Sequence, residues 1–121
     1  MACEERIRDW SWVGVRPTAL KDWGQAPDAY GFYEIGYLLK GEFMPMYGGR
    51  AAGSTLKDRL EAHYKRSHVP LIAAQRDHLW YRCKSLSRPE VARFVEALHL
   101  AAMEYPWNRR NEWAGHWARE L

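Results

Sequence analysis

A tyrosine, an arginine and a histidine stand at spacings that could bring them to one small site. Tyr47 comes directly before two glycines, and Arg59 and His63 lie four residues apart in a predicted helix. Residues four apart share a helix face, with Cβ atoms about 5–6 Å apart. Arginine there suits a phosphate, because its planar fork matches two oxygens and always stays charged. The alternative is a solvated helix face on which Arg59 and His63 do no chemistry.

A second candidate group lies on a later helix. Glu96 is a carboxylate on a helix face otherwise rich in apolar residues, and Asn108 follows shortly after Pro106. Such a carboxylate is either paired, at the helix edge, or a metal ligand. Magnesium sites use one or two carboxylates and complete their coordination with water and phosphate. Three further histidines show no recognisable ligand spacing and are interpreted as surface or core residues: His68, His78 and His116.

Positive charge is concentrated in the middle of the chain. The net charge of +3 is made up of −2 for residues 1–49, +6 for residues 50–93 and −1 for residues 94–121. A basic middle segment fits a polyanion such as DNA, although a charge cluster is also typical of a solvated face. The residues expected to contact DNA are Arg50, Lys57, Lys65, Arg66, Arg109 and Arg110.

The hydrophobic pattern predicts the elements that must hold these residues. Alternation predicts strands over 31–39, 43–50 and 78–86, the first two joined by a hairpin turn. Helices are predicted from Thr55 to about Arg66, over 70–75, and from a capping box at 87–90 to about Met103. This order predicts an α+β domain with a small three-stranded antiparallel sheet flanked by helices. The last helix is expected to face inward with Val91, Phe94, Val95, Leu98 and Ala102.

The composition indicates one folded domain. The 121 residues are 47% hydrophobic, which suits a modest core. Residues 1–30 are expected to form an N-terminal arm that packs on a domain of residues 31–108, and residues 109–121 a tail or short helix. The sequence predicts a cytoplasmic protein without a membrane span. Its two cysteines lack metal-ligand spacing, its first residues do not resemble a signal peptide, and it has no run of about 20 apolar residues.

Taken together, these residues resemble the GIY-YIG nuclease family. Two tripeptides stand where the family has GIY and YIG, at residues 31–33 and 47–49. Arg59 matches the arginine of the first helix, and His63 the histidine of the restriction and homing branches. Glu96 matches the metal-binding glutamate, and Asn108 the end of the family's E…P-x-N pattern. The resemblance covers residues 31–108, and it departs from the family at Phe32 and Gly48, where isoleucines are usual.

The resemblance implies a GIY-YIG nuclease-like fold and a metal-dependent DNA endonuclease, of restriction or phage-nuclease type. Tyr33 and Tyr47 would lie at the attacking water, Arg59 would hold the phosphate oxygens, and Glu96 would bind one Mg²⁺ (or Mn²⁺) per site. Asn108 would order the site.

The resemblance leaves three questions open. Tyr33, Tyr47 and His63 are all candidates for the group that takes the proton. One such site cuts one strand, so a double-strand break requires a homodimer, a higher homo-oligomer or sequential nicking. The competing interpretation is a non-catalytic nucleic-acid-binding module, or a subunit that keeps the fold while a partner cuts.

Overall fold

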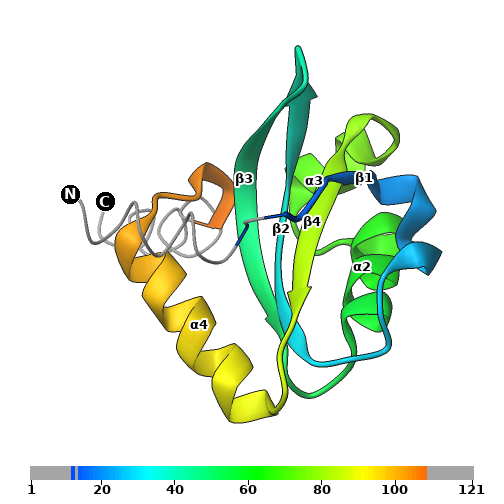
Figure 1. The fold of residues 1–121 in the computed structure, drawn as a ribbon. Coiled ribbons are helices and arrows are strands. Elements are labelled where there is room, and N and C mark those ends of the chain that lie inside the picture. Colours follow the sequence, from blue (N-terminus) through cyan, green and yellow to red (C-terminus); the bar gives the residue numbers. More distant parts are fainter. Residues whose placement is uncertain (1–11, 13, 109–121) are drawn as a thin grey trace, which may run out of the picture.

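The fold is a four-stranded antiparallel sheet with helices against both of its faces (Figure 1). The computed structural model describes residue 12 and residues 14–108. The sheet order is β1-β4-β2-β3, so β3 is an edge strand beside the central β2. The elements in chain order are β1 (Thr18–Ala19), the 3-10 helix η1 (Leu20–Gln25), β2 (Gly31–Leu39), β3 (Glu42–Ala51), α2 (Leu56–Arg66), α3 (Pro70–Gln75), the 3-10 helix η2 (Arg76–His78), β4 (Trp80–Ser85) and α4 (Pro89–Ala102).

The predicted α+β class is confirmed, but the predicted number of strands is wrong. Thr18 pairs with Tyr81 and Ala19 with Trp80, which adds β1 to the sheet beside β4. A strand of two residues is too short to show an alternating pattern, so the sequence carried no signal for it. The strand predicted over 78–86 is shorter in the structure, because His78 belongs to η2.

The two long helices differ in how well their sequences predict them. Thr55 caps α2 as predicted, and its hydroxyl accepts a hydrogen bond from the Asp58 amide at 3.1 Å. The predicted capping box of α4 is wrong, because Arg88 is the N-cap residue and no side chain caps the helix. The predicted inward face is wrong at Phe94, which is 64% exposed. The buried residues of α4 are Ala92, Val95 and His99.

The alternation of β2 divides the core between the two faces of the sheet. Tyr33 and Ile35 pack with α2 and α3 on one face, whereas Phe32 packs with α4 on the other. The ring of His99 stacks on Phe32 with centroids 4.4 Å apart, which explains why this histidine faces inward. Ala92, Val95 and His99 lie on one face of α4, and this face therefore meets the sheet through small or flat side chains.

Glu34 is a fully buried carboxylate on the α4 face of β2. The Arg82 guanidinium pairs with its Oε1 at 2.6 Å, and the Tyr105 hydroxyl donates to its Oε2. Arg82 itself lies over the rings of Trp12 and Phe43, at 4.5 and 4.8 Å from their centroids. A buried charge is tolerated only when it is paired and hydrogen-bonded, and this network meets that condition on β2.

Two glycines of β3 make room for tyrosines on opposite faces of the sheet. Gly48 lies opposite Glu34, and a Cβ there would come within 2.8 Å of the Tyr105 ring. Gly49 lies opposite Tyr33, and a Cβ there would come within 2.5 Å of the Tyr33 hydroxyl. The space that an isoleucine side chain at position 48 would occupy is therefore filled by the ring of Tyr105.

In the described part of the chain, no helix is both long and apolar enough to cross a membrane.

We expect Gly48→Ala to lower the free energy of unfolding by about 1–3 kcal/mol, because the added methyl group meets the Tyr105 ring in a packed core. Gly24→Ala is the matched control, since nothing lies within 4 Å of a Cβ at that position. Its effect should stay within about 0.5 kcal/mol. Urea unfolding of both variants measures the difference, and equal stabilities would contradict the packing described for Tyr105.

Candidate active site

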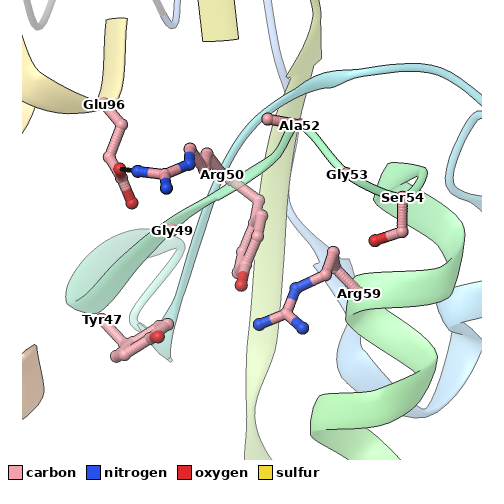
Figure 2. A pocket seen from close by; sticks show the side chains of 9 residues that line it. Tyr47, Gly49, Arg50, Ala52, Gly53, Ser54, Arg59 and Glu96 are labelled. Atoms are coloured by element: carbon pink, nitrogen blue, oxygen red, sulfur yellow. Dashed lines mark hydrogen bonds and ion pairs between the residues drawn. The ribbon is translucent and has the colours of Figure 1, made fainter. Parts of the chain in front are cut away.

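A cavity of 360 Å³ opens at the edge of the sheet, where β3 leads into α2. Its polar lining comes from four elements and the loop before α2: Tyr33 of β2, Tyr47 and Arg50 of β3, Ser54 of the loop, Arg59 of α2 and Glu96 of α4. Figure 2 shows Arg50 turned toward Glu96 while Arg59 extends from α2 on the other side of the cavity. Gly48 and Gly49, which follow Tyr47 in β3, carry no side chain. Side chains from both faces of the sheet can therefore line the cavity around β3.

Tyr33 and Tyr47 differ little in burial, but they differ in what they contact. Tyr33 is fully buried, and its hydroxyl lies 2.8 Å from Nε2 of His63. The Tyr47 ring packs edge-on against His63, with centroids 5.1 Å apart. Both tyrosines line the cavity, as their predicted role at the attacking water requires.

His63 does not line the cavity and reaches it through the Tyr33 hydroxyl. Its ring is buried, and Nδ1 lies 2.8 Å from the hydroxyl oxygen of Ser67. His63 therefore contacts the Tyr33 hydroxyl and is separated from the cavity by Tyr33. Arg59, four residues earlier on α2, reaches the cavity itself.

The electrostatics of the site keep both Tyr33 and His63 neutral. Burial raises the pKa of Tyr33 well above its usual value, and the neighbouring Tyr47 adds to this, while Arg59 opposes it. Burial lowers the pKa of His63 to about 3, and the charges of Arg59 and His68 contribute in the same direction. Neither group carries a charge near neutral pH in this environment.

Glu96 lies at the cavity with its carboxylate paired to Arg50. The Arg50 side chain is 46% exposed and the Glu96 side chain 15% exposed, so the pair lies near the surface. Among the described residues, no group of three or more potential His, Cys, Asp or Glu ligands gathers into a metal site. One carboxylate fits a hard cation such as Mg²⁺, which keeps several waters and takes other ligands from phosphate.

Asn108 lies against the outer edge of β3. Its side-chain amide accepts from the Gly48 N–H and donates to the Gly48 carbonyl, both at 2.8 Å. These two hydrogen bonds satisfy the backbone N–H and carbonyl of Gly48 on the free edge of β3, next to Tyr47. Asn108 does not line the cavity.

Of the predicted DNA-contacting residues that the structure describes, Arg50 alone lines this cavity. Lys57 pairs with Asp28 at 3.5 Å, and Lys65 pairs with Glu61 at 2.7 Å. Lys65 also lies over the ring of Trp23, away from the cavity lining. Arg66 is exposed at the last residue of α2, and Arg109 and Arg110 lie outside the described residues.

The sequence did not predict that Ser67 and His68 lie around His63 at the site. Ser67 contacts His63, and the exposed His68 ring lies 5.6 Å from the His63 ring and 6.4 Å from the Tyr47 ring. The spacing of Ser67, four residues after His63, was a signal that could have found it. Nothing in the sequence distinguished His68 from the other unassigned histidines.

Comparisons of the chain with family models, with curated proteins and with solved structures found no match.

We expect acid to destabilise the protein partly through His63. The unfolded chain binds a proton on this residue near pH 6.5, whereas the folded protein does so only near pH 3. The unfolded state therefore binds more protons between these values, and the free energy of unfolding falls as the pH drops below about 6.5. The slope from this group approaches about 1.4 kcal/mol per pH unit.

Urea unfolding of the parent protein and of His63→Gln, at several pH values between about 7 and 4.5, isolates this contribution. The variant should show a shallower loss of stability with acid than the parent. His78→Gln, at an exposed position, is the control and should keep the parental slope. Parallel slopes for the parent and His63→Gln would show that His63 is not held neutral.

Proposed function

We propose that this chain is a metal-dependent DNA endonuclease that hydrolyses phosphodiester bonds with a GIY-YIG type active site. The observation that carries the proposal is the convergence of Tyr33, Tyr47, Arg59 and Glu96 on one cavity from four separate elements. These are four of the six positions at which the sequence resembles that family; the other two, His63 and Asn108, do not line the cavity.

The lining residues have the chemistry that phosphodiester hydrolysis requires. Arg59 would bind the non-bridging oxygens of the scissile phosphate and stabilise the charge that develops on them in the transition state. The Tyr33 and Tyr47 hydroxyls would orient the attacking water opposite the leaving 3′ oxygen. A divalent ion held by Glu96 and phosphate oxygens, Mg²⁺ or Mn²⁺, would supply electrostatic stabilisation of that leaving oxygen.

Substrate binding would also alter the proton affinity of the site. Burial is the main cause of the low pKa of His63, and the charge of Arg59 lowers it further. An anionic phosphate on Arg59 offsets that charge, so His63 would become more basic only when a substrate is bound. The neutral Tyr33–His63 pair would thus accept a proton from water in the complex more readily than in the free protein.

The ion pair between Arg50 and Glu96 is consistent with this function. Arg50 is half-exposed at the cavity rim, where a DNA phosphate would compete with Glu96 for its guanidinium. The Arg50 end of the pair is open to solvent although the Glu96 side chain is only 15% exposed, so a phosphate can reach the guanidinium and exchange with the carboxylate. Glu96 would then be free to hold the divalent ion beside the bound phosphate.

A nicking assay on supercoiled plasmid, with Mg²⁺, with Mn²⁺ and with a chelator, tests the proposal directly. We expect metal-dependent conversion to open-circular or linear DNA. Binding of DNA without cleavage in either metal would favour the alternative, a non-catalytic nucleic-acid-binding module that keeps this fold.

We expect Glu96→Gln to abolish cleavage and to preserve DNA binding measured without metal. The substitution keeps the size of the side chain and removes its charge, so the divalent ion loses its carboxylate while Arg50 becomes available to phosphate. Glu104→Gln is the matched control, because Glu104 is exposed, lies beyond the end of α4 and does not line the cavity. An inactive Glu104→Gln with an active Glu96→Gln would refute the assignment of Glu96.

We expect Arg59→Ala to reduce the cleavage rate by about 10²–10³, the usual loss for one preorganised transition-state donor. Arg59→Lys should also fail, because a point charge does not reproduce the two-pronged guanidinium. Single-turnover cleavage with saturating enzyme measures the effect separately from DNA affinity. Rates within a few-fold of the parent protein for both variants would exclude Arg59 from the reaction.

A further inference from the structure

A chain of three side chains leads from the cavity to the C-terminal end of α2. The Tyr33 hydroxyl lies 2.8 Å from Nε2 of His63, and Nδ1 of the same ring lies 2.8 Å from the Ser67 hydroxyl. The Ser67 side chain is held in place in turn, because its hydroxyl oxygen accepts a hydrogen bond from the backbone N–H of Val69 at 3.1 Å. Val69 is buried and is the N-cap residue of α3, so the last member of the chain is held by the fold.

The positions of Ser67 and His63 follow from the end of α2. Ser67 is the C-cap residue of this helix and stands four residues after His63, on the same face. The His63 ring is also packed against Tyr33 and Tyr47 at centroid distances of 5.6 and 5.1 Å. Its orientation is therefore determined by packing, and only the position of its single proton is left to the hydrogen bonds.

The donor strengths of the two flanking hydroxyls favour one position for that proton. The Tyr33 phenol is a stronger acid than the Ser67 hydroxyl, so it is the better donor to a neutral imidazole nitrogen. The Tyr33 hydroxyl therefore gives its proton to Nε2 of His63. His63 then carries its proton on Nδ1 and donates it to Ser67, whose oxygen has two lone pairs, one for Val69 and one for His63.

We propose that Ser67 is a positioning residue that holds His63 in the tautomer protonated on Nδ1, so that Nε2 accepts the hydroxyl proton of Tyr33. The inference rests on the proposed endonuclease function for its catalytic consequence, but the tautomer itself is a property of the free protein. An imidazole oriented through its second nitrogen is a general requirement of a histidine that receives protons.

Cleavage of one phosphodiester consumes one water molecule and returns the site to its starting protonation state. The attacking water gives a proton to the Tyr33 oxygen while the original Tyr33 hydroxyl proton passes to Nε2 of His63. The resulting hydroxide forms the new phosphorus–oxygen bond, and the bond from phosphorus to the 3′ oxygen breaks. The 3′ oxygen takes a proton from solvent, and His63 later returns its extra proton through Tyr33 to solvent. Ser67 exchanges no proton in this sequence.

Nitrogen NMR of the ¹⁵N-labelled full-length protein tests the tautomer without any substrate. Long-range proton–nitrogen correlation spectra distinguish a protonated from an unprotonated ring nitrogen, and His63→Gln assigns the signals. We expect Nδ1 of His63 to be protonated and Nε2 unprotonated in the parent protein. In Ser67→Ala the Nε2-protonated form should appear, whereas Ser67→Thr, which keeps the hydroxyl, should restore the parental spectrum.

Cleavage of supercoiled plasmid with Mg²⁺ by the same proteins tests the consequence. Ser67→Ala should lower the single-turnover rate about tenfold, the scale of one hydrogen bond between neutral groups, with DNA affinity unchanged. Ser67→Thr should recover the rate, and Ser87→Ala, at an exposed position before α4, should cut like the parent. A rate loss that Ser67→Thr does not recover would assign Ser67 a packing role and overturn the proposal.

The two measurements separate the inference from the proposed function. An Nε2-protonated His63 in the parent protein would overturn the inference, and so would a Ser67→Ala variant with the parental tautomer or the parental rate. If the tautomers behave as expected but none of the proteins cuts DNA, the proposed function fails and the positioning of His63 by Ser67 stands.

Discussion

The site depends on the absence of side chains at two consecutive residues of the edge strand β3. At Gly49 the Tyr33 hydroxyl occupies the space that a Cβ would fill, and at Gly48 the Tyr105 ring does so on the other face. Either side chain would force a tyrosine away from the strand, since packed interiors leave no room for an added methyl group. The Tyr33 hydroxyl can therefore lie between β3 and α2, and the segment after α4 can close over the opposite face.

The cavity combines buried residues on one side with partly exposed residues on the other. Tyr33 and His63 are buried and kept neutral on the α2 face, whereas Arg50 and Glu96 form a partly exposed ion pair at the cavity rim. Burial makes a charge on either member of the Tyr33–His63 pair costly, whereas a partly exposed ion pair at the rim can exchange partners more easily. Arg59 reaches the cavity between these two environments and acts on both members of the buried pair through its charge.

The last described segment contributes to the site through the backbone. Asn108 satisfies both hydrogen-bonding groups of Gly48 on the free edge of β3, and Tyr105 closes the buried network around Glu34. An edge strand with unpaired backbone groups is otherwise open to pairing with other chains. This segment thus holds in place the strand that carries Tyr47 and Arg50, although neither Tyr105 nor Asn108 lines the cavity.

The sequence by itself determined the local order of the site. The period-two pattern of β2 assigned Tyr33 and Glu34 to opposite faces, and the Thr55 cap and the four-residue spacing assigned Arg59 and His63 to one face of α2. Only the tertiary structure decided that Arg59 enters the cavity while His63 lies behind Tyr33, that α4 turns His99 inward, and that Arg50 pairs with Glu96. Periodicity depends on neighbours within a few residues, whereas these outcomes depend on packing between elements far apart in the chain, which no local pattern records.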